Sequence, residues 1–172
     1  IKRMDADGTN IVNLGSGFDT PWGVAIQSDG KILVVENDSG LLKRMNPDGT
    51  GITTLVTGLT YPRRVAVQAD GKILVTDSGS NSVKRFNANG TGMEILGSGF
   101  NGPIGIAVQA DGKIIVTDTG NSAIKRMNSD GSNIVTLISG LSSLGVSIQA
   151  DGKIIATYDN SLNRFLETSK SN

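Results

Sequence analysis

Acidic side chains recur at one position of the chain, and together they could hold a divalent cation. Glu36, Asp77 and Asp118 stand at equivalent places in successive repeats, each directly after an apolar run, and Tyr158 takes the corresponding place. Three carboxylates facing one channel would supply the oxygen ligands that calcium takes. The same position also suits a structural role, in which each acid accepts hydrogen bonds that tie one loop to its neighbours. We expect the structural role, and the sequence therefore predicts no metal and no other cofactor.

A second acidic motif, Asp5-Ala6-Asp7-Gly8-Thr9-Asn10, resembles the opening of a calcium loop. Its equivalents in the chain read Asn-Pro-Asp-Gly, Asn-Ala-Asn-Gly and Asn-Ser-Asp-Gly, and none is followed by the later acidic ligands. We therefore expect a hairpin turn here rather than a cation site.

Aromatic and unmatched basic residues gather in the loop that precedes the first strand of each repeat. Trp22 is the only tryptophan, and Arg63 and Arg64 stand outside the basic positions that recur through the chain. Arg64 replaces a glycine that the other three copies keep. The aligned loops are Asp19-Thr20-Pro21-Trp22-Gly23, Thr60-Tyr61-Pro62-Arg63-Arg64, Asn101-Gly102-Pro103-Ile104-Gly105 and Ser142-Ser143-Leu144-Gly145.

Exposed tryptophan, tyrosine and arginine together are typical of a binding hot spot. The aromatic rings stack on sugars or apolar groups, and arginine pairs with carboxylate or phosphate. We expect the guanidinium of Arg64 to meet Glu36 or Asp38 from the neighbouring unit. The alternative is drift among loops, with Trp22 filling the channel. The predicted ligand-binding residues are Asp19, Trp22, Glu36, Asp38, Tyr61, Arg63 and Arg64.

An internal repeat positions these groups. Ala-Asp-Gly-Lys stands at 69–72, 110–113 and 150–153, with Ser-Asp-Gly-Lys at 28–31, and Lys-Arg pairs keep the same spacing. One side chain of each pair is expected at a contact between units and the other in solvent. We expect one domain over 1–172, with repeats at about 2–42, 43–83, 84–124 and 125–162 and a tail at 163–172. Repeats of this length, about 41 residues, indicate a stacked or radial array.

Each repeat reads as four short strands. In one copy they are 64–68, 73–76, 83–86 and 93–96, and Asp-Gly supplies the positive φ of a tight turn between the first two. The fold class expected is an all-β propeller of four-stranded antiparallel blades. A β-sandwich is the alternative, although it rarely carries near-copies at a fixed spacing.

The stretch Pro103-Ile104-Gly105-Ile106-Ala107-Val108, followed by 111–121, resembles an NHL repeat, and 43–50 resembles the YWTD repeats of lipoprotein-receptor propellers. The resemblance implies propellers, commonly of six blades, used mostly for binding. With about four units, this chain would form a four-bladed ring, share a larger ring with a second copy, or be part of a longer propeller. We expect Ile1–Leu14 to pair with strands of the C-terminal unit, in its own chain or a neighbour, and Asn163–Leu166 to form a third strand.

Composition narrows the function. Sixteen basic and sixteen acidic residues give no net charge, which argues against nucleic acid. The chain has no cysteine and no histidine, and no apolar run of membrane-spanning length. We therefore expect a non-catalytic module, secreted or at the cell surface, that binds a protein or glycan and can share a ring with a second copy. The alternatives are a metal-dependent lyase- or lactonase-like enzyme and a structural, oligomerising repeat.

Overall fold

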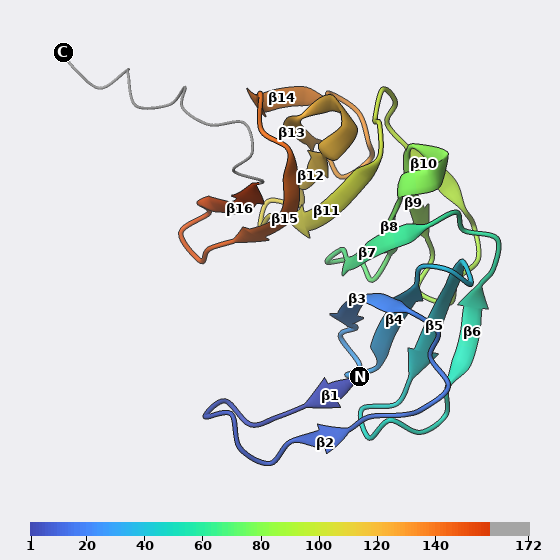
Figure 1. Ribbon diagram of the computed structural model, residues 1–172. Coiled ribbons are helices and arrows are strands. Elements are labelled where there is room, and N and C mark those ends of the chain that lie inside the picture. Colours follow the sequence, from blue (N-terminus) through green and yellow to red (C-terminus); the bar gives the residue numbers. More distant parts are fainter. Residues whose placement is uncertain (159–172) are drawn as a thin grey trace.

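The protein is described by a computed structural model over residues 1–158, and it consists of short antiparallel strands joined by tight turns (Figure 1). The candidate strand at Asn163–Leu166 and the predicted tail at 163–172 lie outside the described residues. The only helices among residues 1–158 are two single 3₁₀ turns, η1 (Ser78–Ser80) and η2 (Thr119–Asn121), so none there is long enough to span a membrane. The predicted all-β propeller architecture is confirmed.

Three complete blades follow one another, each a four-stranded sheet whose strands pair in chain order. The first holds β3 (Pro21–Ile26), β4 (Ile32–Glu36), β5 (Leu41–Met45) and β6 (Thr53–Val56). The second holds β7 (Pro62–Val67), β8 (Ile73–Asp77), β9 (Ser82–Phe86) and β10 (Glu94–Leu96). The third holds β11 (Pro103–Val108), β12 (Ile114–Asp118), β13 (Ala123–Met127) and β14 (Val135–Ser139).

A half blade stands at each end of this arc. The N-terminal half pairs β1 (Lys2–Arg3) with β2 (Val12–Asn13), which correspond to the third and fourth strands of a blade. The C-terminal half pairs β15 (Ser143–Ile148) with β16 (Ile154–Tyr158), which correspond to the first and second. The two halves form separate sheets, so among residues 1–158 of one copy Ile1–Leu14 does not pair with the C-terminal unit. The expected pairing with a neighbouring copy stays a prediction. The repeats counted from the sequence therefore each straddle two blades.

Asp-Gly turns set the register of the first two strands in each unit. In the first blade the Gln27 N–H donates to the Lys31 carbonyl at 2.8 Å, and the Asp29 carboxylate accepts the Lys31 N–H at 3.1 Å. Gly30 supplies the required φ of 83°. At the second kind of turn, Asp7 accepts the backbone N–H and the hydroxyl of Thr9, as the predicted hairpin requires.

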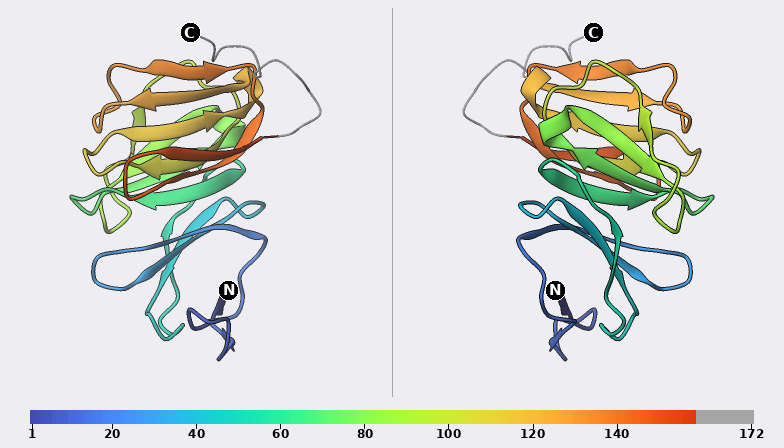
Figure 2. Two further views of the ribbon diagram at one scale, coloured as in Figure 1. Left: turned by 90° about the vertical axis from the view of Figure 1, so that its left-hand side faces the viewer. Right: turned by 90° about the vertical axis from the view of Figure 1, so that its right-hand side faces the viewer.

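The core lies between blades rather than within one sheet. The second strand of each complete blade is buried along its whole length, because neighbouring blades cover both of its faces. Leu33 and Val35 of the first blade pack in one cluster with Val65 and Ile73 of the second. Figure 2 shows the complete blades layered in this way, with β1–β2 at the far end from β11–β14. A blade is therefore stable only beside another.

Arginines of the third strands join consecutive blades at one repeated contact. Arg3 donates to the Pro47 carbonyl at 3.1 Å, and Arg44 to Ala88 at 3.3 Å. Arg85 donates to Ser129 at 2.6 Å, again 44 residues further along the chain. The lysine of each complete-blade pair is also engaged, as described below. The expectation that one member of each pair simply faces solvent is therefore wrong for Lys84-Arg85.

Close approach of first strands near the axis explains the glycine at the start of β3. A Cβ on Gly23 would lie 2.9 Å from the Arg63 carbonyl oxygen, the Arg64 Cα and Val35 Cγ2. Two of these three atoms belong to the backbone of the next blade, which cannot rotate away. The spacing between blades therefore depends on having no side chain here.

Replacing Gly23 with alanine should push the first two complete blades apart. We expect Gly23→Ala to lower the free energy of unfolding in urea by about 1–3 kcal/mol, the usual cost of overpacking. Ser28→Ala, in an exposed turn, is the control and should change little. Equal stability of Gly23→Ala and the wild type would contradict the crowding described.

Candidate ligand-binding face

A fully buried carboxylate ends the second strand of each complete blade and organises the loops around it. The Glu36 carboxylate accepts hydrogen bonds from Lys43 Nζ at 2.7 Å, Ser39 Oγ at 2.7 Å and the Asp19 N–H at 3.0 Å. Lys43 lies on the next strand of the same blade. The Asp19 N–H belongs to the loop that leads into the first strand. One acid therefore links that loop to the third strand, which carries Lys43.

Donors at equivalent positions meet the other two acids: a lysine of the third strand, a side chain three residues after the acid, and an N–H of the loop before the first strand. Asp77 accepts from Lys84, from Ser80 Oγ at 2.8 Å and from the Thr60 N–H at 2.6 Å. Asp118 accepts from Lys125 at 2.6 Å, from Asn121 Nδ2 at 2.7 Å and from the Asn101 N–H at 2.7 Å. Each carboxylate is thus satisfied within its own blade, and residues 1–158 contain no group of three acidic side chains placed to share a metal ion.

Glu36, which the sequence predicts as a ligand-binding residue, lies buried beneath the loops. Its side chain has no exposed area, so a ligand would meet the loops that Glu36 holds rather than its carboxylate. Burial by itself raises the pKa of Glu36, but the hydrogen bonds from Lys43, Ser39 and the Asp19 N–H together bring the pKa below its ordinary value.

Because the pKa of Glu36 is lower in the folded than in the unfolded state, its charge stabilises the fold. This stabilisation is complete above the unfolded pKa of about 4.3, and is lost as the pH falls through the lower pKa of the folded state. Glu36→Gln removes the charge at every pH. At pH 7 we expect it to cost on the order of 3 kcal/mol, because Lys43 is left without its buried partner.

Urea unfolding between pH 3 and pH 7 measures both effects. The Glu36→Gln protein should lose less stability than the wild type as the pH falls. Asp29→Asn, in an exposed Asp-Gly-Lys turn, is the control and should follow the wild type closely at pH 7. Parallel pH profiles for Glu36→Gln and the wild type would contradict the role assigned to this carboxylate.

An aromatic–cation pair lies exposed between the first two complete blades. The guanidinium carbon of Arg63 stands 4.1 Å from the centre of the Trp22 ring. Trp22 keeps 43% of its surface exposed, and Tyr61, two residues before Arg63, keeps 56%. The Arg63 side chain donates no hydrogen bond to any group among residues 1–158, and its Nε is buried without a partner. The Arg63 Nη groups are therefore the donors available to an incoming acceptor, whereas the buried Nε is not.

The neighbouring Arg64 is used internally. It donates to the Trp22 carbonyl, and at 3.2 Å to the Arg63 carbonyl. The expectation that Glu36 or Asp38 receives this guanidinium is wrong, because Glu36 is occupied by Lys43 and Asp38 accepts from Thr20 Oγ1 at 2.9 Å. Arg64 thus fixes the position of the Trp22 backbone instead of presenting a charge.

The two remaining predicted residues, Asp19 and Asp38, lie beside the Trp22–Arg63 pair. Asp19 and Asp38 are both exposed, and the Thr20 hydroxyl lies within hydrogen-bond distance of each, at 3.1 and 2.9 Å. Thr20 is a residue that the sequence analysis did not select. Leu144, at the position equivalent to Trp22, is also exposed and was not predicted. Its alignment with Trp22 in the fourth copy is the sequence signal that could have indicated it. We name the exposed residues Asp19, Trp22, Asp38 and Tyr61, together with the half-buried Thr20 and Arg63, the loop face.

Two residues of the loop face hold a backbone conformation that favours glycine. Thr20 has φ of 47° and Tyr61 has φ of 51°, whereas the third copy has Gly102 with φ of 54° at the same position. A left-handed conformation costs a residue with a Cβ about 1–3 kcal/mol. Retaining threonine and tyrosine despite that cost is consistent with a use for their side chains.

Tyr61→Gly should therefore relieve backbone strain. We expect a melting temperature equal to or above that of the wild type, measured by differential scanning calorimetry, because the exposed ring contributes little packing. Tyr61→Ala keeps the strain and serves as the matched control, with a lower melting temperature than Tyr61→Gly. A clear loss of stability in Tyr61→Gly would show that the ring is a structural element.

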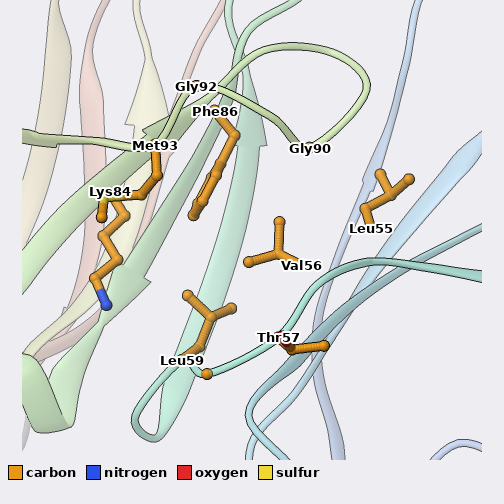
Figure 3. A pocket seen from close by; sticks show the side chains of 10 residues that line it. Leu55, Val56, Thr57, Leu59, Lys84, Phe86, Gly90, Gly92 and Met93 are labelled. Carbon is orange, nitrogen blue, oxygen red and sulfur yellow. The ribbon is translucent and has the colours of Figure 1, made fainter.

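Two hollows among residues 1–158 lie away from the loop face. One of about 340 Å³ opens at the outer side between β6 and β9–β10, where Leu55, Val56, Phe86 and Met93 line it (Figure 3). Another of about 220 Å³ lies among the Asp-Gly turns, beside Gln27 and Arg44. Neither hollow involves the loop face, whose exposed Trp22 and Tyr61 project from the surface and suit a macromolecule better than a small molecule.

Residues 59–86 and 100–127 match the NHL repeat family, which confirms the resemblance seen in the sequence. The chain matches no curated protein sequence. Among solved structures it is similar to a nidogen–laminin complex, at 21% identity and a TM-score of 0.77 over 81% of this chain and 57% of that one.

Two structures of enzymes are also similar. A gluconolactonase from Xanthomonas campestris matches at 17% identity and a TM-score of 0.76, over 91% of this chain and 61% of that one. A catalytically inactive virginiamycin B lyase from Staphylococcus aureus with quinupristin, in which a histidine is replaced by alanine, matches at 20% identity and 0.67, over 80% and 48%. The chain thus spans about half the length of these propellers, and at such identities the similarity concerns the fold.

Proposed function

We propose that the chain is a non-catalytic binding module that recognises a protein through the loop face. The observation that carries this proposal is the stack of the half-buried Arg63 on the exposed Trp22, with guanidinium donors that no group among residues 1–158 receives. Interface hot spots are enriched in tryptophan, tyrosine and arginine, and this face holds all three at the starts of the neighbouring first strands β3 and β7.

The chemistry of the loop face selects the kind of partner. A carboxylate would receive two parallel hydrogen bonds from Arg63, whose planar group is already oriented by the Trp22 ring. Trp22 and Tyr61 offer apolar area beside that contact. We therefore assign the face to an acidic segment of a protein flanked by an apolar residue. A sugar bearing a carboxylate has the same chemistry and is distinguished below. Placement outside the cell or at its surface forms part of the same proposal.

The enzyme alternative rests on the similarity to a lyase, with a TM-score of 0.67, and to a gluconolactonase, whose TM-score of 0.76 is close to the 0.77 of the nidogen–laminin complex. In the lyase structure the loss of one histidine accompanies inactivity, and this chain has no histidine. Its buried acids are each held by a lysine and a backbone N–H. Lactone hydrolysis that depends on a metal bound by the purified chain would favour the enzyme.

Binding by variants of the loop face tests the proposal. Peptides selected from a random display library on the wild-type chain should be enriched in aspartate or glutamate. Trp22→Ala and Arg63→Ala should each weaken their binding by roughly 30-fold, corresponding to the ~2 kcal/mol of a hot spot. Arg63→Lys keeps the charge but not the planar fork, and should fall between them and the wild type.

Lys113→Ala, in an Asp-Gly turn at the other end of a blade, is the control and should bind as the wild type does. A glycan array run in parallel decides between peptide and sugar. Ligands whose affinity ignores Trp22 and Arg63 would place the site elsewhere. Failure to select any ligand would leave a structural repeat as the better description.

A further inference from the structure

The two half blades are complementary in the strands they contain. β15 and β16 supply the first two strands of a blade, and within residues 1–158 the far edge of β16 pairs with no strand. β1 and β2 supply the third and fourth strands, and β1 pairs only with β2 among those residues. An open edge of unpaired backbone groups is a template for another strand.

Apolar residues are exposed at the C-terminal open end where the complete blades bury them. Ile155 of β16 keeps 54% of its surface exposed, whereas its equivalents Leu33, Leu74 and Ile115 have none. Leu137 of β14 is 40% exposed, against 4% for its equivalent Leu14. These side chains lack the following blade that covers their counterparts.

The N-terminal open end shows the matching pattern. Met4 is 54% exposed, whereas its equivalents Met45, Phe86 and Met127 are 1%, 2% and 1% exposed. Val24 of β3 is 55% exposed, against 7% for Val65 and 8% for Ile106. These side chains lack the preceding blade.

The intact interfaces show which of these groups belong together. Leu33 of one blade clusters with Val65 of the next, so the equivalent pair across the open ends is Ile155 with Val24. Met45 clusters with Leu14 of the preceding half blade, so the equivalent pair is Met4 with Leu137. One seam would therefore bury all four exposed side chains at once.

We propose that β1–β2 of one copy completes the half blade β15–β16 of a second copy. The register follows from the complete blades, in which Lys43 faces Val34, Lys84 faces Val75 and Lys125 faces Val116. The corresponding pairs at the seam are Lys2 with Ala156, Arg3 with Ile155 and Met4 with Ile154. The seam also places Leu144 of the second copy beside Trp22, and so extends the loop face.

The curvature of the arc points to a second copy rather than to closure of one chain on itself. Figure 1 shows the two half blades held apart at the ends of an open arc. About four fifths of the chain superposes on about half of larger propellers, so its blades turn less sharply than in a ring that this chain could close alone. Two copies supply eight blade equivalents, within the range of 4–8 seen in propellers. Head-to-tail contacts that close produce such a ring.

Molar mass in solution tests the association. Light scattering after size exclusion should give twice the 17.9 kDa of one chain. Ile155→Asp should give the mass of a single folded chain, because its side chain is exposed in an isolated copy. Ile95→Asp is the matched control, since Ile95 is 61% exposed on β10 of a complete blade. A wild-type monomer, or a dimer unaffected by Ile155→Asp, would overturn the proposal.

A designed disulfide tests the register and separates a second copy from the same copy. The chain has no cysteine, so Lys2→Cys/Ala156→Cys introduces one pair. Directly opposed strand residues meet the distance that a disulfide needs. Oxidation should give a covalent dimer on denaturing gels, whereas Lys2→Cys/Asp151→Cys, out of register, should not. A disulfide within one chain would establish a four-bladed ring instead. Absence of any disulfide would also overturn the proposal. It is the result expected if residues 163–166 pair with the edge of β16.

Discussion

A buried carboxylate at the end of each second strand is the constraint on which the loop face depends. Each of these acids, Glu36, Asp77 and Asp118, ends a fully buried strand just before a polar loop. A buried charge is stable there only because a lysine and a backbone N–H pair with it. The N–H comes from the loop that leads into the first strand. That loop is therefore held from below while its side chains remain free to differ between copies.

The repeated contacts explain how a uniform scaffold and a variable surface coexist in one chain of near-copies. Arginines bond the next blade's turn at a spacing of 44 residues, and glycines let first strands approach near the axis. Neither contact involves the side chains of Trp22, Tyr61 or Arg63. Because every blade buries its apolar residues against a neighbour, however, the arc leaves Met4, Val24, Leu137 and Ile155 uncovered at its ends.

The architecture could be predicted from the sequence because its signals are local. Asp-Gly turns, short alternating runs and a fixed repeat spacing place β7 to β10 close to the expected ranges. The turn at Asp7 and the structural use of the acids also follow from comparing copies. Which strand begins each blade could not be predicted, because the repeat spacing is the same whichever strand is taken as the first.

The site was less accessible to sequence reasoning because its contacts depend on which side chain reaches which atom. Arg63 and Arg64 are adjacent in sequence, yet one stacks on Trp22 and the other bonds backbone carbonyls. Glu36 looked like a surface acid, and only the position of Lys43 on the adjoining strand shows that it is buried. Thr20 and Tyr61 have left-handed backbone that no composition argument indicates.

Hydrogen exchange of three backbone amides tests most directly whether the buried acids hold the loop face. The N–H groups of Asp19, Thr60 and Asn101 lie in loops, where amides ordinarily exchange fast, but each donates to a buried carboxylate. We predict exchange as slow as in the core strands β4, β8 and β12, with Asp19 alone becoming fast in Glu36→Gln. Fast exchange of all three amides in the wild-type protein would contradict the account.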